Sequence, residues 1–132
     1  MIALLLGSCQ KKTTPLFVLK TDSGIDFKNQ LFPSAELNIL TYLYYYNGGG
    51  VATGDFNNDG LIDLYFTGNQ VSDKLYLNQG ALQFKDITAA ALIQNDSGWT
   101  TGVTTVDINN DGLLDSYVCK VGEFESIKGQ NI

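Results

Sequence analysis

The segment GVATGDFNNDGLIDLYF at residues 50–66 occurs a second time as GVTTVDINNDGLLDSYV at residues 102–118. The two copies overlay at an offset of 52 residues, with Gly, Val, Thr, Asp, Asn, Leu and Tyr recurring in register. Self-similarity at a fixed spacing of this size is the sequence signature of a repeat architecture. The chain is therefore predicted to contain tandem copies of one structural unit.

Each copy has the local pattern of strand, turn and strand. In the first, the β-branched run at 51–53 leads into a loop rich in Asp, Asn and Gly, and an apolar run follows at 64–67. A second hairpin is predicted from the runs at 74–77 and 82–88, with the turn Asn-Gln-Gly at 78–80 between them. Four antiparallel strands per repeat are the content of one propeller blade. The predicted fold class is all-β, built from blades of the β-propeller type.

The organisation of the chain follows from this repeat. Residues 1–9 are predicted to be a lipoprotein signal peptide, 10–15 a tether, and 16–132 the repeat region, with a first full repeat at about 47–98 and a second, partial one at about 99–132. A propeller needs at least about four blades to close. About two units predict an incomplete propeller, a fragment of a larger one.

The stretch LFVLKTDSGIDF at residues 16–27 resembles the sequence from Phe84 onward. It is predicted to supply a strand equivalent to the end of a preceding unit.

The loop shared by both copies reads DxNxDGxxD. Ca²⁺ takes six to eight oxygen ligands, and short carboxylate and amide side chains on alternate loop residues can converge on one ion. A glycine at the sixth position allows the sharp turn that such a loop requires. Two Ca²⁺ sites are therefore predicted, with side-chain oxygens and one leucine carbonyl in each. The first uses Asp55, Asn57, Asp59, the Leu61 carbonyl and Asp63, and the second uses Asp107, Asn109, Asp111, the Leu113 carbonyl and Asp115.

Other interpretations of these loops remain open. They could be Asx-rich turns that hold no ion. An EF-hand would require a bidentate Glu at position 12, where Phe66 and Val118 stand, and helical flanks. Dockerin modules share the ligand spacing but continue into helices, whereas the segments after these loops are strand-like. The expected role of the ion is to stabilise the hairpin and not to perform chemistry.

The N-terminus MIALLLGSC has a short apolar run with small residues before Cys9. The run is too short for a transmembrane helix, which needs about 20 apolar residues, and it is typical of a secretory h-region. Leu-Gly-Ser-Cys at residues 6–9 resembles the bacterial lipobox, which implies cleavage before Cys9 and its lipidation. A cytosolic protein that begins with an apolar strand is the alternative.

Composition narrows the classes of function. The net charge is −6, and six of the fourteen acidic residues lie in the two loops, which leaves eight acidic residues against eight lysines elsewhere. The chain has no Arg, so bidentate recognition of phosphate or base edges is excluded and no nucleic-acid partner is expected. It also has no His, which excludes Ser-His-Asp or Cys-His catalysis within the chain. We expect a protein that is not an enzyme.

The tyrosine-rich segment, the single tryptophan and the second cysteine are interpreted separately. Tyr42, Tyr44 and Tyr46 alternate, which predicts a strand with the three rings on one face, used for packing between blades or for stacking on sugar rings. Trp99, just before the second copy, is predicted to anchor the edge of a blade, with a ligand platform as the alternative. Cys119 is predicted to be a small buried residue of a strand, with a redox or intermolecular role as the alternative.

The residues just described resemble a known group. GVATGDFNNDGLIDLYFTGN followed by KLYLNQGALQFKDIT is similar to the FG-GAP or VCBS-type repeat, which also forms the blades of integrin α-subunit propellers. The similarity extends to bacterial surface lipoproteins that carry such repeats with an ASPIC/UnbV-type domain, relatives of cartilage acidic protein.

The resemblance implies seven-bladed propellers and an extracytoplasmic role in adhesion or ligand binding, with no enzymatic activity. The implied location is the outer membrane of a Gram-negative bacterium, on its periplasmic or surface face, with the lipid at Cys9 as the membrane contact. The implied partner is a protein or a carbohydrate. The alternative is a scaffold fragment of a larger propeller enzyme whose catalytic residues lie outside this chain.

Overall fold

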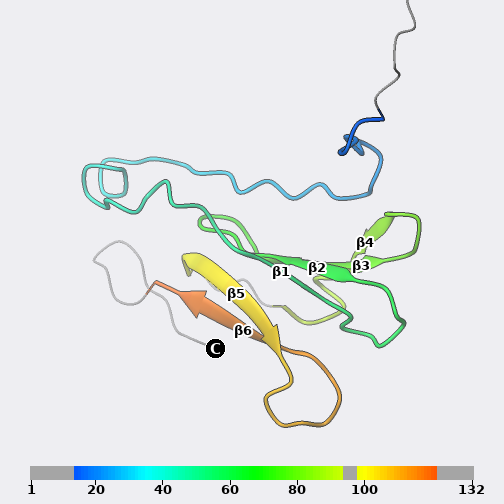
Figure 1. Ribbon diagram of the computed structural model, residues 1–132. Coiled ribbons are helices and arrows are strands. Elements are labelled where there is room, and N and C mark those ends of the chain that lie inside the picture. Colours follow the sequence, from blue (N-terminus) through cyan, green and yellow to red (C-terminus); the bar gives the residue numbers. More distant parts are fainter. Residues whose placement is uncertain (1–13, 94–97, 122–132) are drawn as a thin grey trace, which may run out of the picture.

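The computed structural model describes residues 14–93 and 98–121, and strands are the only regular elements in these ranges. The strands are β1 (Val51–Gly54), β2 (Asp63–Phe66), β3 (Lys74–Asn78), β4 (Phe84–Asp86), β5 (Thr100–Val106) and β6 (Asp115–Lys120) (Figure 1). Within the same ranges, no helix has the length and apolar character needed to cross a bilayer. The predicted signal peptide with Cys9, and most of the predicted tether, lie outside the described residues.

The first repeat forms one antiparallel sheet with the strand order β1-β2-β3-β4. Each strand pairs with the next one in sequence, so short loops are enough to connect them. The pairing of Gly54 with Asp63 closes the first acidic loop at its base. The predicted four-stranded blade is confirmed, and so is the all-β fold class.

The second repeat contributes a two-stranded antiparallel sheet, β5-β6. Val106 pairs with Asp115, which corresponds to the pairing of Gly54 with Asp63 in the first sheet. The pairing shifts between Thr100 and Gly102, so a local irregularity marks the start of β5. The sequence repeat is therefore a structural repeat of the hairpin that carries the acidic loop.

The main core lies between the two sheets, which pack against each other (Figure 1). Tyr65 lies opposite both Ala52 and Leu75 across the first sheet, and all three side chains are buried. They pack against Val118 of β6. Alternate residues of a strand face the same side, so the period-two pattern of β1 and β2 directs one face of the first sheet onto the second.

The strand predicted for residues 16–27 does not form. Leu16 to Leu19 are almost fully exposed and have no ladder partner. The chain meets the first sheet only from Ser23 onward, where the Ser23 carbonyl accepts the Phe84 amide of β4 at 2.7 Å. At Gly24, with φ +83°, a Cβ would lie 2.3 Å from the Phe84 carbonyl oxygen, so this close approach needs a residue without a side chain.

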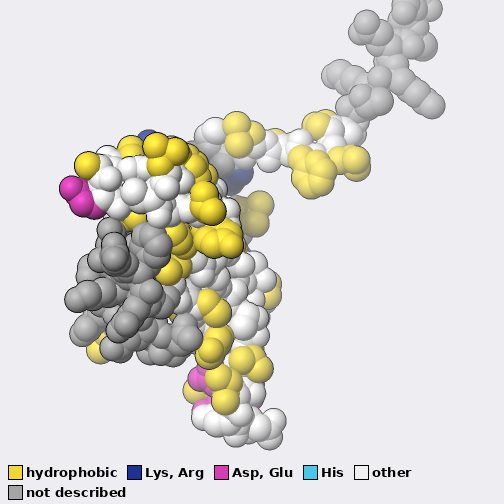
Figure 2. All heavy atoms as spheres, turned by 90° about the vertical axis from the view of Figure 1, so that its left-hand side faces the viewer, with side chains coloured by type: hydrophobic (Ala, Val, Ile, Leu, Met, Phe, Trp, Pro, Cys, Tyr) yellow, Lys and Arg dark blue, Asp and Glu magenta, His cyan; other side chains and the backbone are white. Residues whose placement is uncertain are grey.

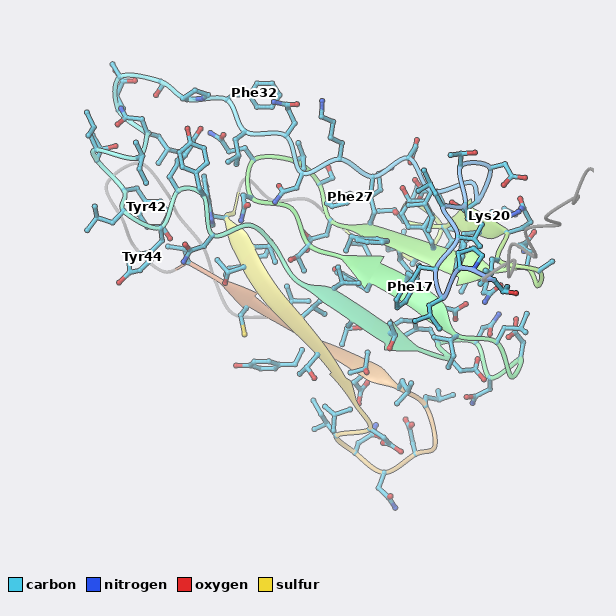
Figure 3. All side chains as sticks on the ribbon, turned by 45° about the horizontal axis from the view of Figure 1, so that its top comes forward. Phe17, Lys20, Phe27, Phe32, Tyr42 and Tyr44 are labelled. Atoms are coloured by element: carbon cyan, nitrogen blue, oxygen red, sulfur yellow. The ribbon has the colours of Figure 1, made fainter. Side chains whose placement is uncertain are left out.

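Residues just after this point cover the second face of the first sheet. The Phe27 ring stacks on Phe66 with centroids 5.1 Å apart, and Figure 3 shows Phe27 pointing toward the sheet. The buried Tyr76 hydroxyl donates to Asp26 Oδ1 at 2.5 Å. The first sheet is thus covered on one face by the second sheet and on the other by residues 26 and 27.

The predicted strand with Tyr42, Tyr44 and Tyr46 on one face is wrong. Residues 41–47 form successive turns, because the Asn38 carbonyl accepts the amides of Thr41 and Tyr42 and no ladder forms. The buried tyrosines are therefore three residues apart and not two, since Tyr42 and Tyr45 are buried together with Trp99. Tyr44 and Tyr46 are exposed. The packing predicted for Trp99 is confirmed, since its side chain is only 2% exposed.

Cys119 is exposed, so its predicted burial is also wrong. The alternation of β6 explains the difference, because Val118 and Lys120 are buried on either side of it and their side chains take the opposite face.

Candidate metal-binding loops

The two acidic loops have the same backbone conformation. Asn58 and Asn110 adopt φ angles of 57° and 59°, and Gly60 and Gly112 both adopt 85°. These left-handed conformations are unfavourable for most residues but are tolerated by Asn and Gly. The pattern NDG therefore directs the chain through two consecutive reversals in each loop, and this confirms the sharp turn predicted at the glycines.

Within the first loop, the predicted ligands bond to backbone amides. Asp55 accepts the Asp59 amide at 3.0 Å and the Gly60 amide at 2.7 Å. Asn57 Oδ1 accepts the same Asp59 amide at 3.2 Å, and its Nδ2 donates to Asp59 Oδ2 at 2.8 Å. Asp59 Oδ1 accepts the Leu61 amide at 2.8 Å. The oxygens of the first, third and fifth loop positions are thereby brought together.

The second loop repeats these contacts. Asp107 accepts the Asp111 and Gly112 amides at 3.1 and 2.8 Å, and Asn109 bonds to Asp111 at 2.9 Å. The Leu113 amide donates to Asp111 Oδ1 at 2.8 Å, and this bond and the one from Asn109 lower the pKa of Asp111. The two loops therefore present the same set of oxygens.

The ninth loop position is built differently. Asp63 is fully buried, and its carboxylate accepts the Phe56 amide at 2.9 Å and the Asn78 amide of β3 at 2.8 Å. Asp115 repeats the first of these bonds with the Ile108 amide at 3.0 Å. A carboxylate in this position joins the base of the loop to the neighbouring backbone. This role was not predicted from the sequence.

Of the predicted ligands, each loop brings together two carboxylates and one amide. Among the residues that the structure describes, no group of three or more His, Cys, Asp or Glu side chains is close enough to hold a metal ion. The side chain of Leu113 is exposed, and that of Leu61 is half-buried.

The loops are also connected to each other across the repeat. Asn58 Nδ2 donates to the Gly112 carbonyl at 3.3 Å, and Thr105 Oγ1 donates to the Thr53 carbonyl at 3.1 Å. The first acidic loop follows β1 and the second follows β5, and these two strands contact each other where the two sheets meet (Figure 1). The two loops consequently form one acidic edge of the molecule.

A buried polar cluster joins the repeats near the other end of the strands. Asn69 Nδ2 donates to the carbonyls of Gly48 and Thr100, both at 3.0 Å. Asp73 accepts the Gly68 amide at 2.8 Å and the Tyr65 hydroxyl at 3.3 Å, and burial raises the pKa of its carboxyl group. Sequence reasoning missed both residues. Neither residue lies in the duplicated segment, so the internal repeat does not single them out.

Taken together, these features define a four-stranded antiparallel β blade followed by a two-stranded hairpin, with an acidic loop at the same position in each repeat. Residues 55–118 match the sequence model of the FG-GAP-like repeat, a range that begins at the first loop and ends in β6. This segment of the chain therefore carries an FG-GAP-like repeat. No curated protein and no solved structure matches the chain.

Proposed function

We propose that this chain is a calcium-stabilised, lipid-anchored binding module that acts outside the cytoplasm and recognises a protein or a glycan. The FG-GAP-like repeat indicates a propeller-type extracellular binding module. The observation that carries the finer proposal is the duplicated loop, whose oxygens converge in the same way at both sites.

The donor chemistry of the loops suits calcium. Carboxylate and amide oxygens are hard ligands of the type that Ca²⁺ prefers. Asp55, Asn57, Asp59 and the Leu61 carbonyl would hold the first ion, and their counterparts in the second loop would hold the second. Asp63 and Asp115 can also contribute, because a carboxylate oxygen has lone pairs beyond the one used by an amide. The ion would offset the repulsion between clustered carboxylates and so stabilise each hairpin.

The proposed anchor rests on the sequence at Cys9 alone, which lies outside the described residues. Lipidation there would hold the repeat region close to a membrane, and a dual acyl signal on one residue is enough for stable anchoring. The surface lipoproteins that the chain resembles would provide the setting. Replacing Cys9 by Ser is expected to release the protein from the membrane fraction, and continued sedimentation with membranes would contradict the anchor.

Calorimetry tests the calcium sites. The full chain with Cys9→Ser, titrated with CaCl₂, should show two binding events. The double substitution Asp59→Ala and Asp111→Ala should abolish both, because it removes the carboxylate at the centre of each loop's hydrogen-bond set.

A control with Asp22→Ala removes one carboxylate on an exposed segment outside the loops and should bind as the parent does. Circular dichroism should show that all variants remain folded at the CaCl₂ concentration used. An unchanged titration in the double variant would refute the ligand assignment.

A further inference from the structure

The loop that precedes β1 carries an exposed aromatic surface on a buried aromatic base. Tyr42 and Tyr45 point inward and pack on Trp99, with ring centroids 5.4 Å from it in both cases. Tyr44 and Tyr46 point outward and are 63% and 66% exposed. Figure 3 shows Tyr42 and Tyr44 at one end of the molecule, away from the loop between β5 and β6.

The exposed rings are held in place by the buried ones. Tyr44 makes an edge contact with Tyr42 at 5.9 Å, and Tyr46 makes one with Tyr45 at 5.0 Å. Edge-to-face pairs of this kind are favourable and fix the relative orientation of the rings. The base itself is fixed by the Tyr45 hydroxyl, which donates to Gln70 Oε1 at 3.2 Å. The two outer rings therefore form a positioned surface.

The segment that carries these rings has no charged side chains. No Asp, Glu, Lys or Arg occurs between Leu37 and Gly54. Leu40 and Leu43 are also exposed beside the rings in sequence. Figure 2, which views the molecule from this end, shows hydrophobic side chains spread over this part of the surface, with acidic and basic side-chain atoms at its margin.

We propose that Tyr44 and Tyr46 form a binding surface for a neutral polysaccharide, which deepens the proposed binding function and rests on it. An aromatic ring offers a flat apolar face for the C–H groups of a sugar ring, and the tyrosine hydroxyl offers a polar tip. The missing charge disfavours an anionic polymer, because nothing here would compensate its carboxylates or sulfates. Two adjacent positioned rings suit an extended chain of sugars.

Affinity electrophoresis of the full chain with Cys9→Ser tests this site. Native gels would contain laminarin, xylan, mannan or dextran as neutral probes, and alginate or polygalacturonate as charged ones. We expect retardation by at least one neutral polymer. The double substitution Tyr44→Ala and Tyr46→Ala should weaken binding by at least about tenfold, because two ring contacts with the sugar are lost and each contributes a similar part of the binding affinity.

Two further variants separate ring loss from general damage. Tyr117→Ala removes a tyrosine of β6 that is 43% exposed, and it should bind as the parent does. Leu43→Glu keeps both rings but places a charge beside them, and it should also weaken retardation. Because Leu43 is 78% exposed, this change should leave the fold intact.

Several outcomes would overturn the proposal. Retardation by charged polymers alone would do so, and so would equal retardation of the parent and the double variant, which would leave the binding function standing and move its site elsewhere. If no polysaccharide retards the parent but a protein-coated surface retains it through the same two rings, the occupant is a protein. If nothing retains the parent, the proposed binding function fails as well.

Discussion

Replacing Asp63 by Asn is the most informative single substitution in this chain. Both carboxylate oxygens accept backbone amides, one from Phe56 in the loop and one from Asn78 in the neighbouring strand. Asn has nearly the same shape but carries one acceptor and one donor group. One of the two amides would then face an NH₂ group in a fully buried position.

The magnitude follows from these two contacts. A hydrogen bond to a charged group contributes about 1.5–3 kcal/mol, and a buried donor without a partner costs about 1–3 kcal/mol. Burying a neutral amide in place of a carboxylate recovers part of this, because the charge no longer has to be desolvated. We expect a net loss of about 2–3 kcal/mol in the free energy of unfolding. With a urea m-value of about 1–3 kcal/mol per molar, the midpoint should fall by roughly 1–3 M.

The assay is urea unfolding followed by the fluorescence of Trp99, measured in CaCl₂ and again in EDTA. The loss should persist in EDTA, because the two amide bonds are internal to the chain. Asp115→Asn is the matched control: Asp115 is only half-buried and makes one such bond, so its loss should be smaller. A loss that appears only with calcium would show that Asp63 acts as a metal ligand and would refute its role in joining the loop to β3.

Three other predictions concern the buried side chain of Asn69, the ion pair of Lys74 with Asp86 and the exposed thiol of Cys119. Asn69→Ala should cost about 2–4 kcal/mol in unfolding free energy, because one buried carbonyl (Thr100) and one half-buried carbonyl (Gly48) lose their donor. Asn58→Gly tolerates the left-handed φ of 57° and removes only one long bond at an exposed site, so it should change this free energy by less than about 0.5 kcal/mol; equal effects in thermal unfolding would contradict this. Burial raises the pKa of Asp86, but hydrogen bonds from Lys74 and a nearby threonine outweigh it and lower the pKa to about 2. The stabilisation from this lowered pKa is therefore fully present above the unfolded value near 3.8 and is lost as the pH falls toward 2. Lys74→Met should make the urea midpoint less dependent on pH between pH 5 and pH 2, and an unchanged pH dependence would count against the pairing of Lys74 with Asp86. Cys119 should react with a thiol reagent in the native protein at a rate close to that in urea, and strong native protection would contradict its exposure.

Much of the fold could be predicted because its decisive contacts are local. In the first sheet each strand pairs with the next, so the turn signals between apolar runs define the ladder as well as the elements. The duplicated segment then extends the prediction to the hairpin of β5 and β6. The fold of the first repeat follows from short-range pattern alone.

The tyrosine loop shows where this reasoning ends. Tyr42, Tyr44 and Tyr46 alternate as in a strand, but Tyr45 between them is the residue that is buried with Tyr42. Four tyrosines in five positions fit a period of two and a period of three equally well. The deciding interaction is the bond from the Tyr42 amide to the Asn38 carbonyl, together with packing on Trp99, which is distant in sequence.

The candidate site divides in the same way. The spacing of Asp55, Asn57 and Asp59 predicts that their oxygens meet, and they do, because the bonds lie within six residues. The spacing could not predict that Asp63 turns to the backbone, since its partner Asn78 belongs to another strand. Contacts within a short loop can be predicted from the sequence, whereas contacts between strands depend on the register of the whole sheet.

The positions of the two candidate surfaces bear on how they could work together. The aromatic loop and Trp99 precede β1 and β5, and the acidic loops follow the same strands. At about 3.3 Å per residue, the seven residues of β5 separate the ends by roughly 20 Å. This exceeds the Debye length of about 8 Å at physiological salt. The field of six carboxylates is therefore screened before it reaches Tyr44 and Tyr46, so an acidic ion site and a surface suited to uncharged sugars can occupy one small module without interfering.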